Sequence, residues 1–242
     1  EPIIFKDHFC DVPAISKWFI PSQTETGYHE LNFPYLSNCG STVVPLELTR
    51  FDATGKRTVS FERFEAPLSL LLSHMISSDT SLALYLAQCS LNDLPSQVQT
   101  DIPTPALINR LGRGDIYGSS LWMGRPPTRT PLHRDPNPNL FVQLAGRKVI
   151  RLMRPKQGTR LYERSRVGQG HANMRGDEMM AGQEMERLES VVWGEDSSDN
   201  ESVGGVEATL DSGQALFIPR GWWHAVRGVG KGANASANWW FR

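Results

Sequence analysis

The chain has few cysteines, almost no net charge and no long apolar run, and each absence narrows what it can be. Its 242 residues include only Cys10, Cys39 and Cys89, an odd number at spacings that fit neither a disulfide framework nor a C-x-x-C zinc site. Reduced thiols in a nuclear or cytoplasmic protein are therefore expected. The 25 basic and 26 acidic side chains give a formal net charge of −1, which argues against nucleic-acid binding by bulk charge.

Membrane and secretory features are also missing. No apolar run approaches the roughly 20 residues needed to span a bilayer. The first residues, EPIIFKDHF, have neither the basic nor the apolar region of a secretory signal. No membrane association is expected, no internal repeat is visible, and no feature indicates an oligomeric state. The length suits one large domain or two small ones, and single-domain β-barrels and sandwiches often reach it.

The first part of the chain, to about residue 115, mixes candidate helices and strands. APLSLLLSHMISS has the period of a helix, whereas LALYLAQCSL is short enough to be either a helix or a strand. Residues 42–51, TVVPLELTRF, predict a strand whose proline favours the edge of a sheet. DLPSQVQTDIPTP predicts a loop interrupted by prolines.

From about residue 116 the pattern changes to short strands between turn residues. Several such strands predict a barrel or a sandwich. The segment at about 156–205 interrupts them: its first portion is compatible with a helix, and its acidic, serine-rich end predicts a loop. The predicted strand segments are IYGSSLWMG, NLFVQLAG, KVIRLMR, GVEATLDSG, QALFIPRG, WWHAVRGV and ASANWWFR.

Residues 130–152, TPLHRDPNPNLFVQLAGRKVIRL, contain a candidate metal pair. His133 and Asp135 are two residues apart, so on a strand their side chains would share one face. With one more histidine they would form the two-histidine, one-carboxylate set of non-haem Fe(II) oxygenases. Alone, however, this tripeptide also occurs by chance on many protein surfaces.

His224 is the best candidate for the third ligand. It follows two tryptophans at the predicted start of a strand, in ALFIPRGWWHAV, where an imidazole can be held rigidly. The alternative is an aromatic core cluster with a hydrogen-bonded histidine. His171 is the competing ligand, but it lies in a glycine-rich segment without rigid support.

Lys148 is a candidate for binding the cosubstrate of such an oxygenase. In enzymes that use 2-oxoglutarate, the distal carboxylate of the cosubstrate needs a cation inside the barrel. Lys148 is predicted on the strand that follows NLFVQLAG, and a buried lysine is costly unless it meets an anion. Thr130 offers a hydroxyl for the same carboxylate. The alternation of RKVIRL also allows Lys148 to face solvent.

Several separated segments together resemble the Jumonji-C (JmjC) family of Fe(II)- and 2-oxoglutarate-dependent oxygenases. They are TPLHRDPNPNLFVQLAGRKVIRL, ALFIPRGWWHAV and SANWWF. LYLAQCSLNDLPSQVQTDI and LWMGRPPTRTPLHRDPNPN resemble most closely the small JmjC-only protein hydroxylases, the arginyl hydroxylases of the jumonji-domain protein five type. The resemblance covers about residues 42–155 and 205–242. It implies a mainly β chain with packed helices, a single double-stranded β-helix (jelly-roll, cupin-like) JmjC domain over residues 1–242.

The resemblance also implies a role for individual residues. The positions that match iron ligands are His133, Asp135 and His224. Those that match binders of the distal carboxylate of 2-oxoglutarate are Lys148, Thr130 and Tyr85, and those near its C1 carboxylate are Asn139 and, lining the same pocket, Asn238.

Trp122 and Glu47 match residues that hold the target arginine in the arginyl hydroxylases. A carboxylate beside an aromatic plane suits a guanidinium. The alternatives are plain core packing for Trp122 and a surface charge on an edge strand for Glu47.

The implied function is hydroxylation of a protein side chain, arginine first, with Fe(II), 2-oxoglutarate and O2 consumed to give succinate and CO2. The expected partner is a protein or peptide that presents an arginine. A histone N-methyl-lysine or N-methyl-arginine demethylase would use the same iron chemistry, but the short chain and the spacing from His133 to Lys148 favour the hydroxylase. A catalytically inactive cupin-like binding module and a small-molecule or tRNA-modifying oxygenase are further alternatives.

Overall fold

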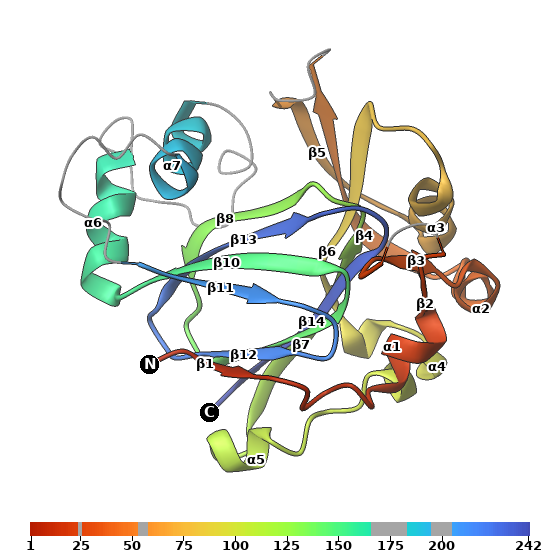
Figure 1. Cartoon of the computed structure of the whole chain (residues 1–242), viewed down its shortest axis with the longest axis horizontal. Coiled ribbons are helices and arrows are strands. Elements are labelled where there is room, and N and C mark those ends of the chain that lie inside the picture. Colours follow the sequence, from red (N-terminus) through yellow and green to blue (C-terminus); the bar gives the residue numbers. More distant parts are fainter. Residues whose placement is uncertain (24–25, 53–57, 166–182, 195–204) are drawn as a thin grey trace.

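Two antiparallel sheets of unequal size face each other in this chain (Figure 1). A computed structural model describes residues 1–23, 26–52, 58–165, 183–194 and 205–242. The larger sheet, called here the large sheet, has the order β1-β12-β9-β14-β7-β6-β4-β5, and the smaller one, the small sheet, has the order β11-β10-β13-β8. The architecture is that of a jelly-roll, as expected for a cupin-like domain.

The strands of the large sheet are β1 (Ile3–Phe5), β12 (Ala215–Ile218), β9 (Asn139–Ala145), β14 (Asn234–Phe241), β7 (Ile116–Gly124), β6 (Leu82–Ser90), β4 (Val43–Phe51) and β5 (Thr58–Pro67). Those of the small sheet are β11 (Val206–Leu210), β10 (Arg147–Met153), β13 (Trp223–Val229) and β8 (Thr128–Arg134). A separate hairpin consists of β2 (Phe19–Pro21) and β3 (His29–Leu31). Strands from both the N-terminal and the C-terminal part of the chain thus share the large sheet.

Helices cover the outer face of the large sheet. They are α1 (Pro13–Trp18), α2 (Phe33–Leu36), α3 (Leu68–Ile76), α4 (Ser96–Asp101) and α5 (Ile108–Leu111), with short 3₁₀ turns η1 (Ser37–Cys39) and η2 (Leu91–Asp93). Every residue of β9 is buried, because alternate side chains face two different cores. Leu140 and Val142 pack with Trp18 of α1 on the outer face. Phe141 packs between the sheets against residues of β10 and β12.

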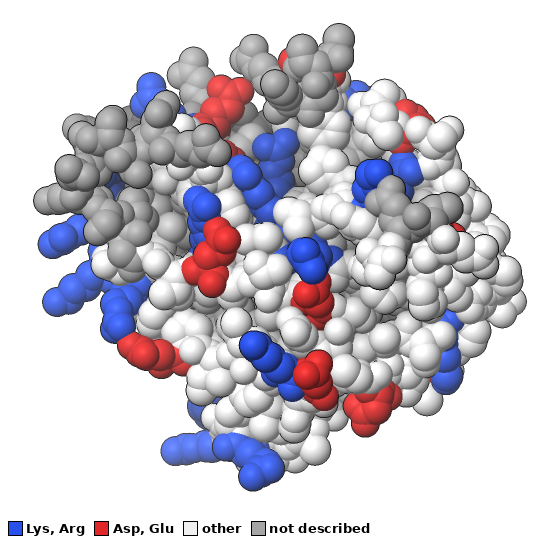
Figure 2. Space-filling model, viewed as in Figure 1, with Lys and Arg blue, Asp and Glu red and all other residues white. Residues whose placement is uncertain are grey.

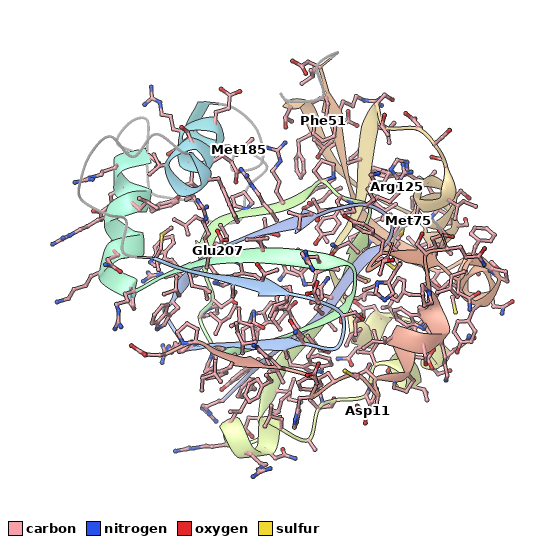
Figure 3. All side chains as sticks on the ribbon, in the orientation of Figure 1. Asp11, Phe51, Met75, Arg125, Met185 and Glu207 are labelled. Carbon is pink, nitrogen blue, oxygen red and sulfur yellow. The ribbon has the colours of Figure 1, made fainter. Side chains whose placement is uncertain are left out.

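The outer face of the small sheet is covered by α6 (Pro155–Ser165) and α7 (Gln183–Trp193). Leu161 of α6 and Leu188 of α7 pack on Leu132 and Trp223 of the sheet. The approach of α6 is so close that a Cβ atom at Gly158 would lie 2.2 Å from Cγ of Trp223. Side chains from both sheets fill the space between them (Figure 3).

Several predictions from the sequence are confirmed. Helix α3 falls within APLSLLLSHMISS, LALYLAQCSL forms strand β6, and each strand segment predicted after residue 116 contains a strand. The segment after β10 contains helices α6 and α7. Its acidic, serine-rich end and His171 lie outside the described residues.

Two predictions are wrong. The strand at 42–51 is not at an edge, because β4 lies between β5 and β6. Its pairing with β6 starts at Leu46, so Pro45 interrupts no ladder on that side, and β5 forms the edge instead. DLPSQVQTDIPTP is not all loop, because it contains α4, which begins directly after Pro95 and buries Val98 against the large sheet.

The surface carries both signs of charge. Figure 2 shows acidic and basic side chains interspersed on one face of the molecule. Cross-strand ion pairs such as Arg147–Asp211 and Arg151–Glu207, with N–O distances of 2.7 and 2.8 Å, contribute to this pattern. Among the described residues, no helix is both long and apolar enough to cross a bilayer.

Candidate metal and cosubstrate site

The small sheet brings the three predicted metal ligands together. His133 of β8 and His224 of β13 are directly opposite in the strand register, and their ring centroids are 4.2 Å apart. Asp135 follows β8 by one residue, with Oδ2 3.6 Å from Nε2 of His224 and Oδ1 4.0 Å from Nε2 of His133. One ligand atom from each residue lies within 4.8 Å of the other two.

Hydrogen bonds orient all three side chains. Nδ1 of His133 lies 2.8 Å from the carbonyl oxygen of Pro131, and Nδ1 of His224 lies 3.3 Å from that of Trp222. A carbonyl can only accept, so each Nδ1 carries a proton, and in the neutral form of each ring Nε2 keeps its lone pair for a metal. The amide of Asn139 donates to Oδ2 of Asp135 at 2.8 Å.

The protonation states also suit a divalent metal. Burial, followed by the neighbouring His133, lowers the pKa of His224 to about 4, which leaves this imidazole neutral. Burial opposes ionisation of Asp135, but the positive charge that His224 and His133 carry when protonated, together with hydrogen bonds from Trp240 and Asn139, holds the pKa of this carboxyl below its usual value. Two imidazoles and one carboxylate form the donor set that Fe(II) oxygenases use, with open positions for other ligands.

Lys148 of β10 lies between the sheets, with 1% of its surface exposed; the solvent-facing alternative is therefore wrong. Its ammonium donates to Oγ of Ser236 at 2.7 Å and to the hydroxyl of Tyr85 at 3.3 Å. Burial lowers the pKa of Lys148 to about 7. Hydroxyls alone do not compensate the desolvation of a cation, so this group, called here the lysine cluster, is suited to an anion.

Tyr85 can donate to the same anion. Burial, followed by the negative charge of Glu47, raises the pKa of Tyr85 above its usual value, so the phenol stays protonated. Because the lysine donates to the phenol oxygen, the phenol hydrogen is available for an acceptor. Ser236 was missed in the sequence, although it precedes Asn238 by two residues on β14 and therefore shares its face.

The remaining predicted cosubstrate residues lie around these two groups. The amide of Asn238 donates to Oδ1 of Asn139 at 2.8 Å, which links β14 to the residue that orients Asp135. Thr130 of β8 is half-buried opposite Val226. The hydroxyl that hydrogen-bonds with Tyr85 belongs to Thr128, two residues before Thr130. Thr128 was not predicted from the sequence.

The sequence profile of the cupin-like domain matches residues 1–242. The chain belongs to the cupin-like JmjC domain family. Its relatives include JmjC domain-containing protein D of Dictyostelium discoideum, 28% identical over 93% of this chain and 50% of the relative. Lysine-specific demethylase JMJ30 of Arabidopsis thaliana is 26% identical over 99% of this chain and 49% of the relative.

Jumonji C domain-containing protein 5 of Drosophila melanogaster is also similar, with 26% identity over 99% of this chain and 54% of the relative. The chain spans about half the length of these curated relatives. The family resemblance of the sequence motifs is thereby confirmed.

Trp122 and Glu47 lie on the inner face of the large sheet of this JmjC domain. The Trp122 ring is 6.1 Å from the Tyr85 ring, and its buried indole N–H has no acceptor among the described residues. Glu47 is opposite Tyr85 in the pairing of β4 with β6, and its side chain is 12% exposed. Glu47 is therefore not a surface charge on an edge strand.

Proposed function

We propose that this JmjC domain is an Fe(II)- and 2-oxoglutarate-dependent oxygenase that hydroxylates a protein side chain, with arginine as the first candidate. The observation that supports it best is the buried lysine cluster in the same barrel as the His133–Asp135–His224 group. A metal site alone fits many proteins. A buried cation with spare hydroxyl donors beside it also needs an anion, and a dicarboxylate that binds the metal at one end provides one.

Each of the chain's own residues then has a defined task. His133, Asp135 and His224 would hold Fe(II), with Asn139 keeping the carboxylate in place. Lys148, Ser236 and Tyr85 would bind the distal carboxylate of 2-oxoglutarate, for which Thr130 and Asn238 are further candidates. When bound, iron and cosubstrate supply the oxidation of an unactivated C–H bond, coupled to conversion of 2-oxoglutarate and O2 into succinate and CO2.

The apolar side chains between the sheets exclude water from this chemistry. Ile150 and Leu152 of β10 and Val226 of β13 belong to the core between the two sheets, on the same strands as Lys148 and His224. A dry, low-dielectric surrounding strengthens the interaction of Lys148 with a carboxylate.

Arginine is the proposed substrate side chain because of Trp122 and Glu47. A guanidinium can stack on an indole while a carboxylate accepts its N–H groups. The half-buried position of Glu47 beside Tyr85 would place such a side chain next to the cosubstrate.

A demethylase is the second candidate, because relatives such as JMJ30 and lysine-specific demethylase 8 of Xenopus tropicalis carry that name. The test is to incubate the chain with Fe(II), 2-oxoglutarate and panels of arginine, lysine and N-methylated peptides. Hydroxylation adds about 16 Da to the peptide, whereas demethylation removes about 14 Da per methyl group. Absence of peptide-stimulated succinate release across the panels would instead favour a binding module.

A further inference from the structure

Three charged or polar residues form a row across the inner face of the large sheet. Glu47 of β4 is opposite Arg63 of β5 on one side and opposite Tyr85 of β6 on the other. Directly opposed residues of antiparallel strands project to the same face. The row therefore runs from the sheet edge, where Arg63 lies, to the lysine cluster, which contains Tyr85.

The carboxylate in the middle of this row is engaged by a guanidinium of the chain itself. Nε of Arg63 donates to Oε1 of Glu47 at 3.0 Å. The Arg63 guanidinium also lies 5.3 Å from the centre of the Phe61 ring, two residues away on the same strand. An arginine paired with a carboxylate and stacked on an aromatic ring has the arrangement proposed for the substrate at Glu47 and Trp122.

Exposure differs between the two partners. The Arg63 side chain is 41% exposed, whereas that of Glu47 is 12% exposed. The carboxylate is thus fixed in the interior row, and the guanidinium reaches it from the solvent side. A partly exposed ion pair is weak enough to exchange partners. In such an exchange the exposed Arg63 side chain would move into solvent, whereas the Glu47 carboxylate would stay on the inner face of the sheet.

We propose that Arg63 is a specificity-determining residue that competes with the substrate for Glu47. A substrate guanidinium that binds Glu47 bidentately needs the Oε1 atom to which Arg63 donates, so the two guanidinium groups compete for this atom. Because of this competition, a cationic side chain binds Glu47 more weakly than it would without Arg63. This inference rests on the proposed function, in which Glu47 receives the substrate cation.

The test measures binding rather than turnover. The chain is loaded with Mn(II) and 2-oxoglutarate, and two probes are titrated by calorimetry: N-acetyl-arginine amide and its neutral isostere N-acetyl-citrulline amide. Arg63→Gln should bind the arginine probe between about twofold and tenfold more tightly than the unmodified chain does, and the citrulline probe equally. Arg63→Lys keeps a cation but not the planar guanidinium. Its affinity for the arginine probe should lie between that of the unmodified chain and that of Arg63→Gln.

Arg50→Gln is the matched control. Arg50 is an exposed arginine of the same β4–β5 hairpin. It follows Glu47 by three residues, so its side chain projects from the opposite face of the large sheet. The substitution Arg50→Gln removes the same charge but keeps the contact of Arg63 with Glu47. Equal tightening in Arg50→Gln and Arg63→Gln, no tightening in Arg63→Gln, or no binding of the arginine probe to any variant would each overturn the inference.

Succinate release in the presence of arginine peptides is measured in parallel and tests the proposed function separately. If Arg63→Gln binds the arginine probe more tightly while no variant releases succinate, the role of Arg63 stands and the oxygenase function fails. If succinate is released but the probe affinities of Arg63→Gln are unchanged, the function stands and the competition by Arg63 is wrong.

Discussion

The two sheets of this JmjC domain contribute different kinds of residue to the same interior. The small sheet provides His133, His224 and Lys148, and Asp135 at the end of one of its strands. The large sheet provides mostly neutral hydrogen-bonding groups, such as the hydroxyls of Tyr85 and Ser236 and the amides of Asn139 and Asn238. Under the proposed function, the small sheet would carry the reactive charges, and the large sheet would position and select what binds to them.

This division can be tested first at the metal. Asp135→Ala should lower Mn(II) or Fe(II) affinity by more than about 100-fold, since even residues that only orient a ligand contribute about 10–100-fold. Anaerobic equilibrium dialysis measures the effect. Asp211→Ala, which removes an exposed carboxylate paired with Arg147, is the control; an equal metal affinity in both variants would remove Asp135 from the ligand set.

The second test concerns the cation of the small sheet. Lys148→Met should weaken 2-oxoglutarate binding by on the order of 100-fold, because a charge-assisted hydrogen bond is lost in a dry site. The same variant should unfold at an equal or higher temperature in the absence of ligand, because an apolar side chain replaces a desolvated cation. Titration calorimetry and thermal unfolding measure the two effects, and normal cosubstrate saturation would contradict the assignment.

Asn139→Ala tests whether a residue of the large sheet supports the metal. Loss of its hydrogen bond to Asp135 should lower metal affinity by about tenfold. Asn38→Ala, an exposed asparagine on η1, is the control. If 2-oxoglutarate affinity falls while metal affinity does not, Asn139 acts on the cosubstrate, as the family resemblance implies. In that case the metal would depend on residues of the small sheet and Asp135 without support from Asn139.

The smallest effect expected is a pH dependence of cosubstrate binding. The pKa of Lys148 is lowered from its ordinary 10.5 to about 7 by burial, and a carboxylate beside it would raise that pKa again. Above pH 7 the ligand-free lysine is mostly neutral, so binding should take up a proton and weaken by at most about tenfold per pH unit. Calorimetry in two buffers of different ionisation enthalpy measures the uptake, which should be absent in Lys148→Met.

Local sequence was sufficient for much of the fold and of the candidate site. The strands after residue 116 were predictable because turn residues separate short apolar segments. His133, Asp135 and Lys148 were predictable because they lie in one continuous stretch of sequence, TPLHRDPNPNLFVQLAGRKVIRL. The sequence does not determine whether Lys148 faces the interior or solvent, because the alternation along RKVIRL defines two faces of the strand without showing which one is buried.

Features that depend on pairing between distant strands were not predictable. Pro45 suggested an edge, but the place of β4 within the sheet depends on β6, about forty residues later. The contact of Arg63 with Glu47 depends on the register in which β4 and β5 pair. The sequence that connects the two strands does not specify this register. Ser236 could have been found, since it shares a strand face with Asn238.

The missing side chain of Gly158 has a consequence for the metal site. Trp223, against which α6 is packed at this glycine, directly precedes His224 in β13. The glycine therefore sets the spacing between α6 and the strand that carries a proposed ligand. A Cβ atom at this position would lie closer to Trp223 than van der Waals contact allows, so alanine would displace the helix or the indole. A shift of the indole would also move His224, the next residue of the strand.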